Sequence, residues 1–182
     1  MELLSNTMNK VKSSVIHDAG YLQLIDIEGY KAVKENDMVV CIPYLVESNT
    51  VLLRYENVPP FELVTPQIDK YVTVMSTVVE GDVLEALKKG LEKEFSIVLK
   101  ESKTPEILQP IFINKGNTAQ YHICILPLMS YDYEMVREDD ARVMEMKDDN
   151  VAVNINEINN LIIYDLISRY TLDLFKKEYS LF

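Results

Sequence analysis

The stretch Tyr71–Leu99 constrains the fold most, because it has the pattern of a strand, a tight turn and an amphipathic helix in direct succession. β-branched residues dominate Tyr71–Val79, which is typical of a β-strand. A glycine then permits the positive φ of a tight turn, and Asp82 followed by Glu85 has the pattern of a helix capping box. Apolar residues recur at helical spacing from there on, which predicts a helix over Val83–Val98 with one buried face.

This succession resembles the Nudix element, G-x5-E-x7-R-E-U-x-E-E-x-G-U, in which U is a bulky aliphatic residue. Aligned from its C-terminal end, the pattern puts Lys89 at the arginine, Leu91 and Ile97 at aliphatic positions, and Glu94 at the last glutamate. The turn Glu80-Gly81-Asp82 resembles the family's E-x-G-E with one residue missing. The resemblance implies an α/β fold of the α+β kind, a Nudix-like α/β/α sandwich with a mixed central sheet flanked by helices.

The departures from the pattern concern the metal site. Gly90 and Lys93 stand where the family has two of the three helix glutamates that hold the catalytic magnesium, and Ser96 stands at the late glycine. Residues three and four apart share one helix face, so this face offers one carboxylate and an ammonium instead of three carboxylates. We therefore predict a degenerate box without a metal site, with Glu80 and Glu94 as residual metal candidates. Glu94 is interpreted as a solvated helix residue, and restoring carboxylates at 90 and 93 is expected to create affinity for divalent ions.

Most of the chain follows the order of the ADP-ribose pyrophosphatase-like branch of the Nudix family, which acts on ADP-ribose and similar sugar nucleotides. That branch has an R-Q-x-R motif where this chain reads Arg54-Tyr55-Glu56-Asn57, so only the first arginine matches. Arg54, Lys89 and Lys93 are the resulting candidates for ligand contacts. We predict a mobile N-terminal segment over residues 1–14 and one domain over 15–182, beginning with a β-hairpin over about 15–35.

Apolar patterns predict the remaining elements. The predicted strands are Tyr21–Ile27, Tyr30–Lys34, Met38–Val46, Val51–Tyr55, Glu106–Asn114, Ala119–Leu128 and Asn150–Ile155. Met38–Val46 is nearly all apolar, which is typical of a central strand buried on both faces. The three prolines in 56–70 indicate a connecting loop, and 129–149 is predicted as an edge strand followed by an acidic loop. A long helix is predicted over Asn156–Tyr179, capped by Asn156.

Composition narrows the class of protein. A chain of 182 residues that is 48% hydrophobic suits one folded domain. The net charge of −11 argues against a nucleic-acid partner, because phosphate binding favours a basic surface. We find no apolar run of membrane-spanning length and no signal-peptide pattern, and therefore expect no membrane association and a location in the cytoplasm or in a particle assembled there. Cys41 and Cys124 lie in apolar runs and are predicted to be buried free thiols.

The N-terminal hairpin is the predicted interface. Its alternation leaves apolar groups on both faces, and exposed strand edges favour pairing with another chain. In the family branch that this chain resembles, the N-terminal sheet commonly joins two subunits. Self-association or a protein partner is therefore expected, with Tyr21, Leu22, Leu24 and Ile25 as interface candidates.

Three functions remain open at this point. The first hypothesis is a catalytically degenerate Nudix-like domain without a cofactor, serving as a structural or protein-interaction component, for instance of a viral or phage assembly. The second is a divergent Nudix hydrolase that cleaves a nucleoside diphosphate derivative, with magnesium held by carboxylates drawn from Glu56, Glu62, Glu80 or Glu94. The third is a nucleotide-binding module that does not hydrolyse its ligand.

Overall fold

The computed structural model describes residues 12–20, 22–56, 71–136 and 150–181. Its helices are α2 (Val83–Phe95), the 3-10 helix η2 (Ile155–Asn160) and α3 (Leu166–Glu178). Its strands are β1 (Ser13–Asp18), β2 (Leu22–Ile27), β3 (Tyr30–Glu35), β4 (Met38–Leu45), β5 (Thr50–Glu56), β6 (Tyr71–Thr73), β7 (Met75–Val78), β8 (Ile97–Leu99), β9 (Tyr121–Leu128), β10 (Tyr133–Met135) and β11 (Asn150–Asn154).

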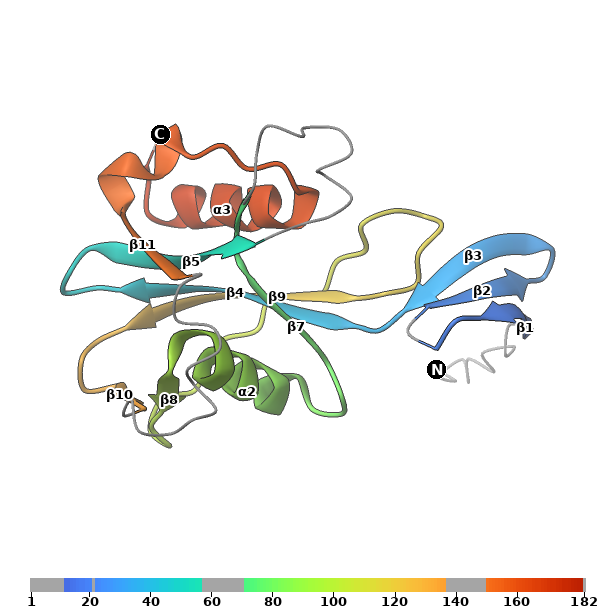
Figure 1. Ribbon diagram of the computed structural model, residues 1–182, viewed down its shortest axis with the longest axis horizontal. Helices are drawn as coiled ribbons and strands as arrows, with labels where there is room; N and C mark the ends of the chain where they lie inside the picture. The colour runs from blue at the N-terminus through green and yellow to red at the C-terminus, as the bar shows by residue number, and fades with distance from the viewer. Residues whose placement is uncertain (1–11, 21, 57–70, 137–149, 182) are drawn as a thin grey trace, which may run out of the picture.

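Strand β4 is the centre of a mixed six-stranded sheet. It pairs in parallel with β9 along its whole length, from Met38 opposite Tyr121 to Leu45 opposite Leu128. On its other side it pairs antiparallel with β7 near its start and with β5 near its end, and β5 extends the sheet to β6 and β11. Helix α2 covers one face of this sheet and α3 covers the other, as Figure 1 shows. The predicted sandwich, with a mixed sheet between helices, is confirmed.

Alternation along β4 builds a core on each face of the sheet. Val39 and Cys41 pack in the cluster under α2, whereas Val40 and Ile42 pack in the cluster under α3. This confirms the prediction of a strand buried on both faces. Cys41 lies opposite Cys124 in the parallel pairing with β9, and both thiols are buried and free, as predicted.

The predicted strand Tyr71–Val79 is divided at Val74, because its two halves pair with different strands. Residues before the break pair with β5 and those after it pair with β4. At the break the backbone N–H of Val74 donates to Ser168 Oγ of α3 at 3.0 Å. The break therefore joins the sheet to the first turn of α3.

Helix α2 begins as predicted but ends three residues early. Asp82 caps it, since Asp82 Oδ1 accepts from the backbone N–H of Glu85 at 3.0 Å. The helix ends at Phe95, and Ser96 follows in the left-handed conformation with φ 58°. Ser96 is the residue aligned with the late glycine of the Nudix pattern, and glycine is the residue that favours this conformation.

The prediction of one helix over Asn156–Tyr179 is wrong. The segment forms η2, then an extended connection, then α3. The connection holds Ile162-Ile163-Tyr164, whose branched and aromatic side chains lower helix propensity, and Asp165 starts a new helix by accepting from Ser168 N at 2.7 Å. Asn154, rather than Asn156, caps η2.

The predicted strand Glu106–Asn114 is also wrong. Pro110 within this stretch and Pro105 just before it lack backbone donors, and the described backbone makes one isolated bridge, between Ile111 and Tyr121, rather than a strand. In 129–149, β10 forms the predicted edge strand, and 137–149 lies outside the described residues. Of the predicted loop over 56–70, Glu56 ends β5 and 57–70 lies outside the described residues.

The N-terminal hairpin is present and gains a third strand, β1. The two-residue turn of Glu28 and Gly29 joins β2 to β3, and both residues have positive φ, as this hairpin type requires. The loop that contains Gly116 and Thr118 is hydrogen-bonded to the outer edge of β3. Val33 N donates to Gly116 O, and Thr118 N donates to Val33 O. Beyond these contacts the three-stranded sheet extends away from the sandwich (Figure 1).

Candidate functional site

Two residues singled out by the sequence, Arg54 and Glu94, meet under α2. Arg54 Nη1 lies 3.0 Å from Glu94 Oε2, and Arg54 Nε lies 3.2 Å from Glu56 Oε1. Neither contact is aligned as a hydrogen bond, since Arg54 Nε and Glu94 Oε2 both lack a hydrogen-bond partner. Arg54 is 3% exposed and Glu94 is 8% exposed. The interpretation of Glu94 as a solvated helix residue is therefore wrong, because its carboxylate is buried against the sheet.

Burial is the main influence on the Glu94 carboxyl. It raises the pKa of Glu94 to about 7, while the Arg54 guanidinium lowers it and the Glu56 carboxylate raises it further. Loss of hydration disfavours the charged form of a carboxyl, and one misaligned arginine compensates only part of that loss. Glu94 therefore changes its charge near neutral pH.

The position of Gly90 is closed to larger side chains. Gly90 faces β7, where an added Cβ would lie 3.0 Å from Thr77 Cγ2 and 3.1 Å from Met75 Cε. These distances are tighter than ordinary contacts, so Thr77 or Met75 would have to shift. A glutamate at 90 thus needs local repacking before it can reach a metal.

The two lysine candidates lie in a separate hollow. Thr77, Glu80, Lys89 and Lys93 line this lysine hollow, which has a volume of about 310 Å³ between β7 and α2. Both lysines are exposed. Glu80 lines the lysine hollow with them and takes no part in the contact between Arg54 and Glu94. Within the described part of the chain, no three histidine, cysteine, aspartate or glutamate side chains are grouped so that they could hold a metal ion.

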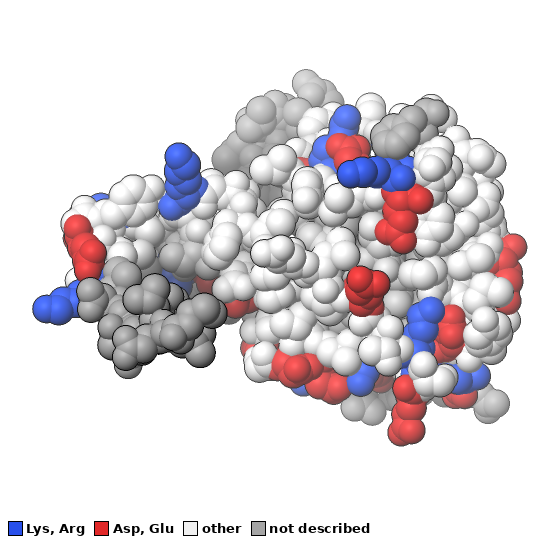
Figure 2. Space-filling view, turned by 180° about the vertical axis from the view of Figure 1, so that it is seen from behind, with Lys and Arg blue, Asp and Glu red and all other residues white. Residues whose placement is uncertain are grey.

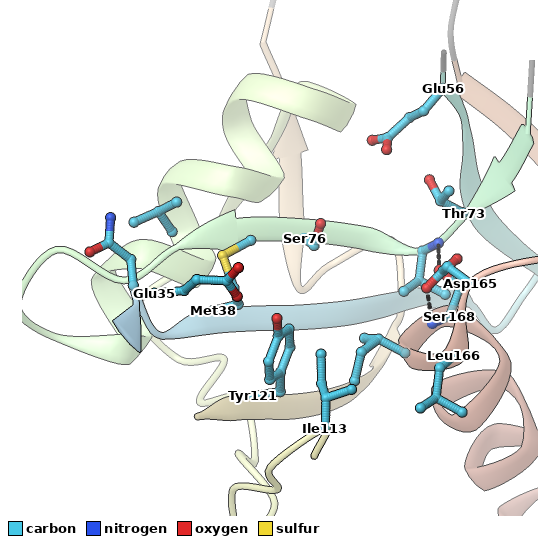
Figure 3. Close-up of a pocket in the computed structure, with 14 residues that line it drawn as sticks. Glu35, Met38, Glu56, Thr73, Ser76, Ile113, Tyr121, Asp165, Leu166 and Ser168 are labelled. Carbon is cyan, nitrogen blue, oxygen red and sulfur yellow. Dashed lines mark hydrogen bonds between the residues drawn. The ribbon is translucent and has the colours of Figure 1, made fainter. Parts of the chain in front are cut away.

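A larger cavity of about 480 Å³ opens beside β7, between the start of β4 and the first turn of α3. We call it the β7 cavity. Its walls are mainly apolar, and Figure 3 shows Met38, Ile113 and Leu166 along them. Glu56, Thr73 and Asp165 lie together at one end, and Glu35 lies at the other (Figure 3).

Several of these cavity residues carry polar atoms without a protein partner. Thr73 Oγ1 and Asp165 Oδ2 are buried and have no hydrogen-bond partner, whereas Asp165 Oδ1 accepts from Ser168 N. Sequence reasoning missed Thr73, Asp165 and Ser168. The signal for Asp165 was an aspartate three residues before Ser168 and next to Leu166 of the predicted apolar stripe, since aspartate is a preferred helix cap.

The remaining sequence candidates are dispersed. Leu22 and Leu24 are partly buried in β2, and Ile25 is 7% exposed and lies opposite Ala32 in the pairing with β3. Tyr21 and Glu62 lie outside the described residues.

The charged surface is mixed on the face seen in Figure 2, where Lys and Arg side chains alternate with Asp and Glu over the sandwich. This distribution differs from the continuous basic surface that phosphate-backbone binding favours. None of the described helices is long and apolar enough to cross a membrane.

The comparisons with known proteins bear on the fold. No protein family matches the sequence, and no curated protein matches it either. The fold is similar to that in the crystal structure of an ADP compounds hydrolase, with a TM-score of 0.61 over 93% of this chain and 92% of that chain. The two chains are 10% identical, so the likeness concerns the fold alone. Together with the mixed sheet, the two covering helices and the N-terminal strands, it gives the chain a Nudix-like fold.

Proposed function

We propose that this chain is a catalytically degenerate Nudix-like domain that serves as a structural or protein-interaction component and does not hydrolyse nucleotides. The carrying observation is the engagement of Glu94 with Arg54. Glu94 is the one carboxylate left on the helix face that holds magnesium in the resembling family, and it is buried against Arg54. Residues on this face of α2 do not fit a magnesium ion, because Gly90 has no side chain and Lys93 carries a positive charge.

The first test is calorimetry with magnesium and manganese, followed by hydrolysis assays on a panel of sugar nucleotides that includes ADP-ribose. We expect no binding of either metal and no turnover. Tight metal binding or metal-dependent turnover by the parent protein would overturn the proposal, and would mean that carboxylates from outside α2 provide the ligands.

Restored carboxylates provide the positive control. Gly90→Glu combined with Lys93→Glu returns three carboxylates to one helix face and is expected to create divalent-ion affinity. Because Gly90 is crowded, the double variant is also expected to be less stable than the parent protein. Thermal unfolding is therefore measured first, and Lys93→Glu alone serves as the milder variant. Lys88→Glu, which adds a carboxylate to an exposed position outside the three box positions, is expected to leave metal binding unchanged.

The interaction role predicts association through the N-terminal sheet. All six residues of β1 are exposed, including the large apolar side chains of Val15 and Ile16, so this outer strand presents an edge suited to pairing. Leu22→Asp is expected to shift the protein to a monomer in gel filtration with light scattering, whereas Lys34→Ser, on the exposed side of β3, is expected to leave association unchanged. A parent that stays monomeric at high concentration, with no partner recovered from its source, would contradict this role.

The choice of Leu22 over Ile25 follows from burial. Ile25 is already buried within the chain, so a charge there would unfold the small sheet and would not isolate an interface. Membership in a viral or phage assembly stays a prediction, and the same partner search tests it.

A second function, nucleotide binding without hydrolysis, is favoured by the lysine hollow. Lys89 and Lys93 are one helical turn apart and line it together with Thr77 and Glu80, so a phosphate would meet two ammonium groups and one carboxylate there. Titration with ADP and ADP-ribose without metal separates this function from the first one. Binding that Lys89→Ser together with Lys93→Ser abolishes would support it.

A further inference from the structure

The β7 cavity has a chemistry that differs from a phosphate site. Three of its lining residues are carboxylates, Glu35, Glu56 and Asp165, and no lysine or arginine is among the described residues that line it. Between the two acidic ends, seen in Figure 3, the walls are apolar, with Met38 and Ile113 among them. A volume of about 480 Å³ lies within the range of small-molecule sites.

The end beside α3 holds two buried oxygens without a hydrogen-bond partner. Thr73 is 6% exposed, and its Oγ1 has no hydrogen-bond partner. Asp165 Oδ2 is buried and also lacks one, and the Glu56 carboxylate is drawn at the same end in Figure 3. Buried polar atoms without a partner cost free energy. The carboxylate oxygens can only accept and the Thr73 hydroxyl can accept as well as donate, so this end is suited to a ligand group that donates several hydrogen bonds.

Nearby positive groups are already engaged. Arg54 lies beside Glu56, but it is 3% exposed and its Nη1 is directed to Glu94. The positive end of α3 is met by its own cap, because Asp165 Oδ1 accepts from Ser168 N at 2.7 Å. An anionic ligand at this end would therefore face carboxylates without a free cation to offset them.

The far end is acidic as well. Glu35 Oε2 accepts from Asn117 Nδ2 at 2.6 Å, which fixes the carboxylate. Tyr121 lines the cavity near it, and both burial and the charge of Glu35 raise the pKa of Tyr121, so its hydroxyl keeps its proton at neutral pH. The cavity thus has an acidic group at each end and an apolar middle.

We propose that the β7 cavity binds a small organic cation, with one or two ammonium or guanidinium groups on an apolar chain. Such a ligand supplies donors to Thr73 and Asp165 and buries its chain against the apolar walls. The site is distinct from the lysine hollow, and the inference goes beyond the proposed function, since it holds whether or not the domain hydrolyses nucleotides.

The test is calorimetry of the full chain with putrescine, spermidine and agmatine, with hexanediol as a neutral probe and ADP as an anionic one. We expect saturable binding of at least one cation and none of hexanediol. Asp165→Asn keeps the helix cap but removes the charge, and Thr73→Val removes the unpartnered hydroxyl. Each is expected to weaken cation binding by about tenfold or more, since a hydrogen bond to a charged group contributes about that factor to affinity.

A matched control comes from the other helix. Asp82→Asn makes the same change at the N-cap of α2, which is exposed and does not line the β7 cavity, and it is expected to leave cation binding unchanged. Thr73→Val keeps the test open if Asp165→Asn folds poorly, because removing an unpartnered buried hydroxyl is not expected to lower stability. Absence of binding by every cation, equal weakening by Asp82→Asn, or binding that survives both cavity variants would overturn the proposal. Preferential binding of ADP, lost in Thr73→Val, would overturn it too and assign the cavity to a nucleotide.

Discussion

Replacing Phe175 by alanine is expected to lower the free energy of unfolding by about 3–5 kcal/mol, the range for deleting a buried aromatic ring. Phe175 is fully buried, and its ring centroid lies 5.4 Å from that of Tyr44 on β4 and 4.7 Å from that of Tyr179. This aromatic cluster holds α3 on the sheet. Chemical denaturation followed by circular dichroism measures the loss.

The same variant tests how α3 shapes the β7 cavity. Asp165 and Ser168 belong to the first turn of α3, so loosened packing at Phe175 is expected to weaken ligand binding beside Val74 as well. Tyr170→Ala, on the outward side of α3 at 39% exposure, is the control and is expected to cost less than about 1 kcal/mol. Equal losses in the two variants would contradict the packing argument.

Local sequence patterns were sufficient to predict the elements whose own apolar residues and capping residues mark them as a strand or a helix. The nearly continuous apolar run Met38–Val46 predicted a strand buried on both faces, and Asp82 predicted the start of α2. The last helix was different, because the apolar stripe through Ile162 and Leu166 suggested burial. Ile162 is 70% exposed, because the chain extends there before α3, and Leu166 is 62% exposed as the first residue of α3 after its cap Asp165. Periodicity cannot distinguish one long helix from two short ones when a capping residue lies inside the pattern.

The sites depended on contacts that no local pattern contains. Glu94 lies three residues after Leu91 and so shares its helix face, but its partner Arg54 lies forty positions earlier on β5, and no local pattern contains that contact. The acceptors of the β7 cavity come together only because Val74 divides its strand and binds Ser168 of α3. Each fact requires the tertiary structure, and the sequence suggested only the individual residues.

Replacing Arg54 by methionine is expected to cost about 1 kcal/mol more at pH 8 than at pH 5. Without its partner the buried Glu94 carboxyl stays protonated, and pH 8 lies about one unit above its pKa in the parent protein. Glu94 has a folded pKa of about 7 against 4.5 for an unperturbed glutamate, so it is mostly protonated in the folded protein at pH 5. A protonated Glu94 needs no guanidinium, and the variant then loses mainly the packing of the arginine stem.

The sign of the pH dependence distinguishes this account from simple loss of packing. Because folding raises the pKa of Glu94, its contribution to stability is complete below about pH 4.5 and is lost as the pH rises through about 7, by about 3 kcal/mol in the parent protein. Arg54→Met raises that pKa further, so its stability continues to fall above pH 7. Arg169→Met is the matched control, because Arg169 pairs with Asp173 on the surface and is expected to cost less than about 1 kcal/mol at either pH. Urea denaturation of the parent protein and of Arg54→Met at pH 5 and pH 8 gives four free energies of unfolding, and Arg169→Met is measured in the same way. A cost for Arg54→Met that is the same at both pH values would mean that Glu94 keeps one protonation state throughout, and that the buried pair does not titrate near neutral pH.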